Sequence, residues 1–542
     1  MALRPSVVPL HVPLPPPPES SLPAVPDPES DLVRAASPIV SCLLASVLTD
    51  PSLKSVATSA LVAKLEDFEC LAAAVPCFAS MLLALEGDPD APDIPIPRSY
   101  GVDYFQTFSP TPKMTTLRVL LYVASQRDYK LHSLDFSTAF LQGNLHEEIW
   151  LRRPPGFTES FPAGTQWSLR RPVYGLRQAP SEWHDALRTT LAALWFAPSI
   201  ADPSLFLHTD TLLPPFYILV YVDDLIFATP DTEALTLVKS ELQKRHTCTD
   251  PGELRSYLGL QITPNKARRT ITLTQSHMVH QVLQRFGFQF SSPQPTPLST
   301  GHSLSAPPSD ESVEPSGPYP ELVGCLMYLM TCTLPDLAYP LMVAPGRHRK
   351  VHWDAVRRVL RYLCSTSGMG LVLGGRGPVV LTGHAGASWV DNSATQRPSQ
   401  GYTFSLGSGS VSWRSTHSSS VLSSSCEAEI YAGAMVAQEL RWLTYLLIDL
   451  GEQPRSPPVL YVDNKAMIAL CQEHRLEHRT KHIALQCFVA RELQQRGQLR
   501  LAYVATRANT ADIFTKALPP GDHQRFSTVL GLVPTLPHLL TA

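Results

Sequence analysis

The chain has 542 residues with 44% hydrophobic content, which is enough for about three to four domains with well-packed cores. Its 44 Lys and Arg against 47 Asp and Glu leave a net charge of −3, which excludes nucleic-acid binding through overall positive charge and requires a local basic patch instead. The sequence has no apolar run that would span a bilayer, no signal-peptide core and no Cys pair at zinc spacing, which predicts an intracellular, cytoplasmic protein without membrane contact.

Residues 1–100 are rich in Pro, Ala and Ser, and the run from Pro15 to Pro18 favours polyproline II. No set of side chains suited to catalysis occurs in this stretch. We therefore expect a partly disordered linker at this end of the chain.

Folded material is expected from Gly101 onwards. Met114 to Gln126 has the apolar pattern of a helix, and Leu131 to Phe136 has that of a short strand that ends near Asp135. A second helix is predicted from Ser181, a good N-cap residue, to Leu194. Taken alone, an Asp at the end of a buried strand fits either a simple cap or a metal ligand.

The stretch from Phe216 to Thr229, FYILVYVDDLIFAT, predicts a β-hairpin with Asp223 and Asp224 at its tip. The two adjacent carboxylates repel each other, and no Lys or Arg occurs from Thr189 to Val238. A distant residue or a bound divalent cation must then neutralise the pair, because hard cations prefer oxygen ligands. The alternative is an exposed Asp-Asp turn, since Asp is common in turns.

Downstream of the hairpin, the apolar patterns predict two groups of elements. Up to residue 375 the predicted helices are Glu233 to Arg245, Ser276 to Phe286, Tyr319 to Met330 and Trp353 to Leu363, and the strands are Leu254 to Thr263 and Thr270 to Thr274, with a linker from Ser291 to Pro318. Beyond it the predicted order is strands Val379 to His384, Gly401 to Leu406 and Ser410 to Arg414, helix Ser425 to Leu450, strand Val459 to Val462, helices Lys465 to Cys471 and Ile483 to Gln495, strand Leu499 to Val504 and helix Ala511 to Leu518. This second group predicts one mixed α/β domain of about 140 residues.

Two sets of carboxylates stand out on these elements. Asp135, Asp223 and Asp224 on adjacent strands would hold two divalent cations, an arrangement suited to in-line phosphoryl transfer. The second set comprises Glu429 in a helix, Asp463 at a strand end and Asp512 in the first turn of a helix. Each member of the second set also fits a solvated, capping or dipole-complementing role, so only their joint occurrence indicates a site.

The chain resembles the Ty1/copia class of retrotransposon polyproteins from Gly101 to about Leu518. Eight motifs carry this resemblance in order: LDFSTAFLQG at Leu134 to Gly143, YGLRQAP at Tyr174 to Pro180, YVDD at Tyr221 to Asp224, YLGL at Tyr257 to Leu260, CEAEIYA at Cys426 to Ala432, YVDNKAMI at Tyr461 to Ile468, RTKHI at Arg479 to Ile483 and NTADIFTKAL at Asn509 to Leu518.

The resemblance implies an RNA-directed DNA polymerase with an α/β and α+β multidomain fold. A right-hand reverse transcriptase palm and thumb would be followed by an RNase H-like mixed-sheet domain. The implied domains are a linker at 1–100, a palm with incomplete fingers at 101–245, a thumb-like segment at 246–290, a linker and connection helices at 291–375, an RNase H-like domain at 376–520 and a C-terminal tail at 521–542.

The resemblance also implies roles for individual residues. Asp135, Asp223 and Asp224 look like the polymerase metal triad for two Mg²⁺ or Mn²⁺ ions, and Glu429, Asp463 and Asp512 look like RNase H metal ligands. The implied substrate-binding residues are the ribose-excluding Phe140, the nucleotide-pocket residues Tyr174, Gly175 and Gln178, Tyr221 of the YVDD motif, the primer-gripping Tyr257, Leu258 and Gly259, and the basic-loop residues Lys481 and His482.

Three departures from the family pattern lower the expected activity. Gly386 stands where the nuclease pattern H-A-D-A-S-W has its first carboxylate, and Asp391 lies five residues too far along to replace it. A Pro-rich spacer, without the basic fingers strand, precedes Gly101, and Leu334 replaces the usual Arg before Pro-Asp. We also find no zinc knuckle, protease or integrase motif, which predicts a fragmentary copy.

The expected partners are an RNA template, a DNA primer or RNA–DNA hybrid, and dNTPs. An intact element would add Gag and integrase within a virus-like particle. Two alternatives remain open: a catalytically dead nucleic-acid-binding remnant of the same element, and a Pro-rich adaptor that acts through residues 1–100.

Overall fold

The computed structural model describes residues 85–88, 107–152, 166–301, 318–343, 350–388, 397–418, 425–454, 456–472 and 484–535. The chain divides into two compact units, one of residues 1–98 with 146–170 and the other of residues 99–145 with 171–542. In the smaller unit β1 (Leu85–Asp88), β4 (Gln166–Leu169) and β3 (Trp150–Arg152) pair in that order as an antiparallel sheet. The larger unit contains the other three sheets and both sets of carboxylates.

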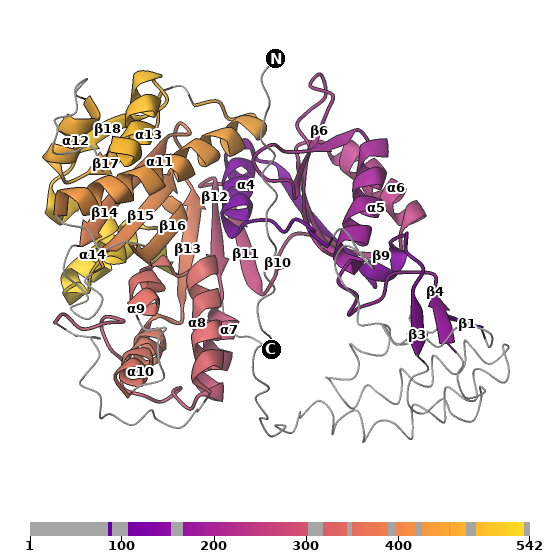
Figure 1. The fold of residues 1–542 in the computed structure, drawn as a ribbon, viewed down its shortest axis with the longest axis horizontal. Coiled ribbons are helices and arrows are strands. Elements are labelled where there is room, and N and C mark those ends of the chain that lie inside the picture. The colour runs from indigo at the N-terminus through magenta and orange to yellow at the C-terminus, as the bar shows by residue number, and fades with distance from the viewer. Residues whose placement is uncertain are drawn as a thin grey trace, which may run out of the picture. The chain divides into compact units, whose positions relative to one another are not determined.

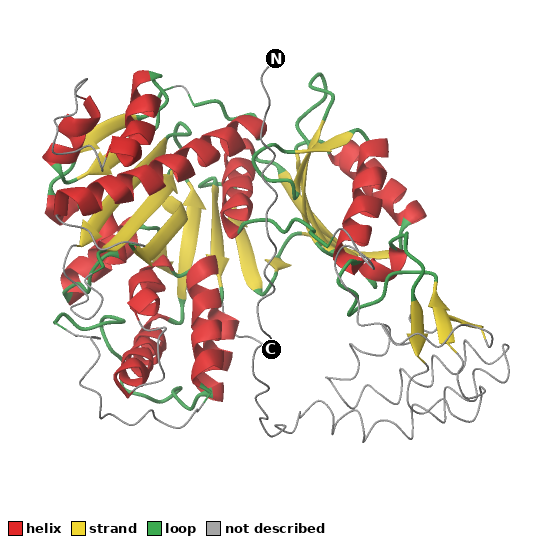
Figure 2. Ribbon diagram, viewed as in Figure 1, coloured by secondary structure: helices red, strands yellow, loops and turns green. Residues whose placement is uncertain are grey.

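The first sheet of the larger unit is antiparallel, with the order β5-β6-β7-β8-β2-β9. On one face Ile218 and Val220 share a core with residues of α5 (Ala179–Ala193) and α6 (Thr232–Arg245). Figures 1 and 2 show these two helices together on one side of the sheet. On the other face Tyr217 and Leu219 join the core that contains α4 (Met114–Arg127). Burial of both faces explains the continuous apolar runs in the sequence. The strands are β2 (Lys130–Phe136), β5 (Phe196–Pro198), β6 (Leu205–His208), β7 (Tyr217–Tyr221), β8 (Asp224–Thr229) and β9 (Cys248–Glu253).

The second sheet, in the order β10-β11-β12-β13-β19, joins strands that are far apart in the sequence. β13 pairs antiparallel with both β12 and β19, so that Leu371 lies opposite Leu273 and Leu532. A tail is predicted from residue 521, and that prediction is wrong for the described residues, which form α14 (Pro520–Val529) and β19 (Leu532–Pro534). A three-residue strand is too short to show periodicity in a sequence. The other strands are β10 (Ser256–Tyr257), β11 (Leu260–Asn265), β12 (Thr270–Thr274) and β13 (Met369–Gly374), and the neighbouring helices are α7 (Ser276–Arg285), α8 (Tyr319–Cys332), η3 (Pro335–Leu337), α9 (Ala338–Val343) and α10 (Lys350–Thr366).

The third sheet has the order β16-β15-β14-β17-β18 and confirms the predicted mixed α/β arrangement. β14 pairs antiparallel with β15 and parallel with β17, and the long helix α11 packs across β14 and β15 (Figure 1). The predicted helix from Ala511 to Leu518 is wrong, because a short 3₁₀ helix, η6 (Thr510–Phe514), occupies this stretch. The remaining elements are β14 (Leu381–Ser388), β15 (Ser399–Leu406), β16 (Gly409–His417), α11 (Ser425–Asp449), β17 (Val459–Val462), α12 (Lys465–Gln472), α13 (Ala484–Gln495), β18 (Arg500–Tyr503) and η5 (Thr506–Ala508).

Helix α4 lies between the three sheets of the larger unit. Ten of its 14 residues are buried, and it contacts β8, β12, β13 and β16. Its buried Arg118 donates hydrogen bonds to the carbonyls of Val411 (2.7 Å), Thr331 (2.7 Å) and Cys332 (3.0 Å). The guanidinium also lies 3.9 Å from the ring centroid of Trp413. Arg118 therefore ties α4 to both the third sheet and the end of α8.

The C-terminal end of α11 docks onto the first sheet. The Tyr217 hydroxyl donates to the Leu450 carbonyl (2.8 Å), and the Trp442 indole donates to the Ala201 carbonyl (2.7 Å). Arg127 forms a two-pronged ion pair with the buried Glu452. The helix that carries Glu429 near its start is thus anchored at its far end to the sheet that carries Asp135.

Among the described residues, no helix combines the length and the apolar character that crossing a membrane requires.

Replacing Arg118 with Ala should lower the free energy of unfolding by roughly 3 kcal/mol, because several buried carbonyls lose a charged donor. Thermal and urea unfolding of the full chain measure this change. Arg188→Ala is the matched control, since Arg188 and its partner Asp185 are both exposed and an ion pair of this kind contributes about 1 kcal/mol or less. Equal losses in the two variants would contradict the bridging role of Arg118.

Candidate active sites

The tip of the β7–β8 hairpin differs in one respect from its prediction. The two-residue turn is Val222–Asp223, and Asp224 is already the first residue of β8, paired with Tyr221. Val222 adopts a left-handed φ of 54°, which is costly for a β-branched residue. The turn therefore lies one residue earlier than the predicted Asp223–Asp224, because Asp224 pairs with Tyr221 and belongs to β8.

Backbone pairing brings the first three carboxylates to one edge of the first sheet. Asp135 near the end of β2 lies opposite Asp224 of β8 in the strand register. The carbonyl of Asp223 accepts a hydrogen bond from the Phe136 N–H at 2.9 Å. The Thr249 hydroxyl on β9 donates to the Asp135 carboxylate at 3.3 Å.

Burial and mutual repulsion both raise the pKa of the two hairpin carboxyls at this edge. Burial, with the charges of Asp223 and Asp135, raises the pKa of Asp224 to about 6. Burial and the Asp135 charge also raise the pKa of Asp223. Within the described ranges no three His, Cys, Asp or Glu side chains are gathered tightly enough to hold a metal ion. The three carboxylates are neighbours in register and their oxygens are the donors that Mg²⁺ prefers, so their chemistry suits a divalent cation that would offset their repulsion, but such a cation would have to draw them closer together than they lie here.

The predicted primer-gripping motif lies beside these carboxylates. β10 and β11 are joined by Leu258 (φ 48°) and Gly259 (φ 71°), a two-residue turn with both φ angles positive. The Tyr328 hydroxyl on α8 donates to the Leu258 carbonyl. Burial, then the charges of Asp224, Tyr221 and Asp223, raise the pKa of Tyr257 above its usual range, which shows that the buried Tyr257 is near the carboxylate edge.

Two of the predicted substrate-binding residues, Phe140 and Tyr174, contact each other. The rings of Phe140, in η2 (Ala139–Gln142), and Tyr174 lie 4.6 Å apart between centroids, and Tyr174 is 45% exposed. Gly175 has a φ of 99°, a conformation that favours glycine. Gln178 is buried at the N-cap of α5.

Trp183 was missed by sequence reasoning, and it contacts the hairpin tip directly. Its indole N–H donates to the Val222 carbonyl at 2.6 Å. An aromatic residue in an amphipathic helix is expected to be an ordinary core residue, so the sequence gave no indication of this contact.

The second set of carboxylates also comes together. Glu429 on α11 accepts a hydrogen bond from the Ala387 N–H on β14 at 3.0 Å. Burial, with the charges of Asp463 and Asp512, raises the pKa of Glu429 to about 8. Its second oxygen, Oε2, is buried without a hydrogen-bond partner in the described part of the chain. Asp512 pairs with Lys516 at 2.8 Å. An unpartnered buried oxygen among carboxylates fits a metal ligand.

Asp512 lies in η6 and not in the first turn of an α-helix, which corrects its predicted setting. Asn509 caps this 3₁₀ helix by accepting from the Ala511 N–H, and it donates to the Ala385 carbonyl at 2.9 Å. The cap therefore ties Asp512 to β14.

Gly386 lies in β14, at the edge of the second set. The parallel register of β14 and β17 ends with the pair His384 and Tyr461. Gly386 and Asp463 each follow two residues later in the sequence. A Cβ at Gly386 would lie 3.3 Å from the Asn509 amide nitrogen and 3.4 Å from the Ala511 Cβ. The position therefore faces the segment that carries Asp512. Asp391, Lys481 and His482 lie outside the described residues.

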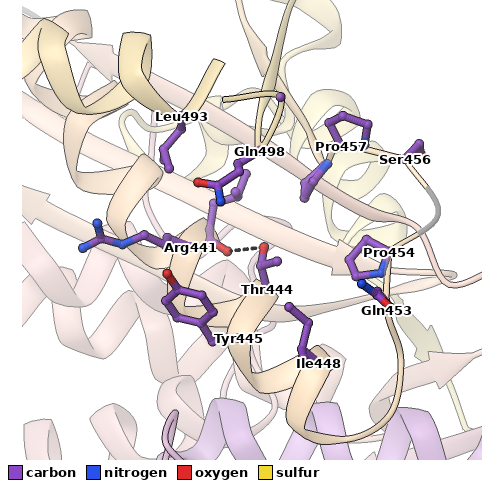
Figure 3. Close-up of a pocket in the computed structure, with 13 residues that line it drawn as sticks. Arg441, Thr444, Tyr445, Ile448, Gln453, Pro454, Ser456, Pro457, Leu493 and Gln498 are labelled. Carbon is purple, nitrogen blue, oxygen red and sulfur yellow. Dashed lines mark hydrogen bonds between the residues drawn. The ribbon is translucent and has the colours of Figure 1, made fainter. Parts of the chain in front are cut away.

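A separate cleft of ≈ 300 Å³ lies between the later half of α11, the Pro454–Pro458 loop and the end of α13. Figure 3 shows Arg441, Tyr445 and Ile448 along one side of it. None of its lining residues is a carboxylate or belongs to either candidate site.

Residues 97–300 match the model of the family described as reverse transcriptase (RNA-dependent DNA polymerase). The chain is 35% identical over 441 residues to a retrovirus-related Pol polyprotein from transposon RE2 of Arabidopsis thaliana, covering 81% of this chain and 30% of that protein. It is 30% identical over 311 residues to a putative transposon Ty5-1 protein of Saccharomyces cerevisiae, covering 57% of this chain and 100% of that protein.

A solved structure of a foamy viral protease-reverse transcriptase in complex with RNA/DNA hybrid covers 73% of this chain and 46% of its own, at 13% identity and a TM-score of 0.39. The chain spans between 29% and 33% of the length of three retrovirus-related Pol polyproteins that it matches.

The pKa of Glu429 gives a testable pH dependence of stability. Its folded value of about 8 lies above the ordinary 4.5, so the stabilisation from its protonated form is complete below pH 4.5 and is lost as the pH rises through about 8. We expect the melting temperature of the metal-free chain to fall over this range, and Glu429→Gln to flatten the fall. Glu439→Gln removes another carboxylate of α11 as a control. Parallel pH curves for wild type and Glu429→Gln would contradict the assignment.

Proposed function

We propose, because the chain belongs to the reverse transcriptase family of Ty1/copia-type retrotransposons, that it carries an RNA-directed DNA polymerase site at the β7–β8 hairpin. The observation that carries the proposal is the register that sets Asp135 opposite Asp224, with Asp223 in the adjoining turn. The substrates would be dNTPs and a DNA primer on an RNA template. The nearby Tyr257 hairpin supports this reading, because a primer end must lie beside the reacting phosphate.

The roles of the residues follow from their positions. Asp135, Asp223 and Asp224 would hold divalent cations, which supply positive charge for nucleotidyl transfer. Phe140, backed by Tyr174, would exclude nucleotides with a ribose 2′-OH by its bulk. The turn at Leu258 and Gly259 would hold the primer strand against the carboxylate edge.

We further propose that polymerase activity is weak and that nuclease activity is absent. The sequence before Gly101 lacks the basic fingers strand that the family uses to hold a triphosphate. At the second site Gly386 supplies no oxygen where the family has a carboxylate, although Glu429, Asp463 and Asp512 are together. A catalytically dead nucleic-acid-binding remnant is the competing function, favoured by the loose grouping of the first three carboxylates.

Primer extension on an RNA template with Mg²⁺ tests the polymerase. We expect slow nucleotide addition by the unmodified chain. The Asp223→Asn, Asp224→Asn variant should lose roughly 100-fold or more in rate, since loss of metal ligands forfeits several kcal/mol of charge stabilisation. Salt-dependent hybrid binding with no Mg²⁺-dependent extension would favour the remnant, and fast processive synthesis would refute the proposed impairment.

Cleavage of an RNA–DNA hybrid tests the nuclease. The chain as it stands should cleave no RNA, and Gly386→Asp should raise cleavage, because it returns a carboxylate to the position where the family pattern has one. A Cβ at this position lies 3.3 Å from the Asn509 amide nitrogen, so the Asn509 side chain must shift by a few tenths of an ångström to admit it. Gly386→Asn is the matched control of the same size without charge. Cleavage by the unmodified chain, or equal effects of the two variants, would show the role assigned to Gly386 to be wrong.

A further inference from the structure

Trp183 joins the two segments that carry the polymerase carboxylates. It lies in the first turns of α5, is 1% exposed, and donates its indole N–H to the Val222 carbonyl at 2.6 Å. Its ring also packs edge-on against Phe136, with centroids 5.0 Å apart, and against His246 at 5.4 Å. Since Phe136 follows Asp135 directly, one side chain contacts both the strand end of Asp135 and the turn of Asp223.

Two hydrogen bonds fix the backbone on either side of Asp223. The Trp183 indole holds the carbonyl of the peptide group that precedes Asp223, and the Phe136 N–H holds the carbonyl of the group that follows it, at 2.9 Å. With both peptide planes held, the φ and ψ angles of Asp223 are determined, and so is the direction of its Cα–Cβ bond.

This turn needs such support for two reasons. Val222 has a φ of 54°, and a β-branched residue keeps that conformation only where its surroundings impose it. The neighbouring carboxylates of Asp135, Asp223 and Asp224 also repel one another, which favours any rotation of the turn that moves Asp223 away.

We propose that Trp183 is a positioning residue for Asp223, whose indole N–H holds the Val222 turn so that the three carboxylates stay at one edge of the sheet. This inference deepens the proposed polymerase function, and its catalytic consequence rests on that function. The mechanical part, support of the turn, rests on the hydrogen bond and the packing alone.

Trp183→Phe in the full chain is the test, because it keeps an aromatic ring and removes the N–H. Hydrogen exchange at the hairpin tip, measured at the Phe136 N–H that donates to the Asp223 carbonyl, should become about fivefold faster without a comparable change elsewhere. Electron paramagnetic resonance with Mn²⁺ alone should show roughly tenfold weaker binding at the polymerase site, with Asp223→Asn, Asp224→Asn marking that site. Trp442→Phe is the matched control, since it also loses an indole bond to a backbone carbonyl but lies away from the hairpin.

Tip exchange in Trp183→Phe that equals wild type, or rises no more than in Trp442→Phe, would overturn the proposal. Should Trp183→Phe fail to fold, exchange in the unmodified chain decides. Support of the turn requires the Phe136 N–H and the Trp183 indole N–H, which donate to its two carbonyls, to exchange as slowly as the neighbouring strand amides, and fast exchange of either refutes the support. If the unmodified chain extends no primer, the polymerase proposal fails, while tip exchange still decides the role of Trp183.

Discussion

Helix α4 is almost completely buried, and the packing of the larger unit depends on that burial. Apolar side chains around the whole helix pack against strands of all three sheets of that unit. The one charge near its middle, Arg118, is satisfied by carbonyls from β16 and from the end of α8. A helix of this composition is stable only when covered on every side, so α4 holds the sheet that carries Asp135 and Asp224 and the sheet that carries Gly386 in one compact unit.

Both candidate sites rest on the same physical conflict, which is the gathering of like charges where the protein partly or fully buries them. At the hairpin, backbone register and two hydrogen bonds hold Asp223 and Asp224 near Asp135 although burial and repulsion raise the pKa of both hairpin carboxyls. At the second site the same conflict raises the pKa of Glu429 to about 8, and Lys516 offsets part of the negative charge through Asp512. The first site has the three carboxylates that the sequence predicts for it, whereas Gly386 beside the second carries no side-chain oxygen.

The long helix α11 connects these two sites mechanically. Glu429 lies near its start. Beyond its far end the Leu450 carbonyl accepts from Tyr217 on β7, and Trp442 donates to the carbonyl of Ala201 between β5 and β6. The loop residue Glu452 pairs with Arg127 at the end of α4. Since β7 leads into the turn that contains Asp223, α11 supports the first sheet directly, and none of these contacts involves Gly386.

The sequence alone determined the features that depend on local composition or on a residue's identity. Continuous apolar runs predicted the doubly buried strands around the hairpin, the ordered motifs indicated the family, and Gly386 was visible as a missing carboxylate. The tertiary structure decided what depends on pairing between distant segments. The pairing of Asp224 with Tyr221 sets the turn at Val222–Asp223. The elements η6 and β19 are too short for their sequences to show a period. The packing of α5 places Trp183 against the turn. A sequence pattern records the period of one element, but hydrogen bonds between elements follow only from how those elements pack.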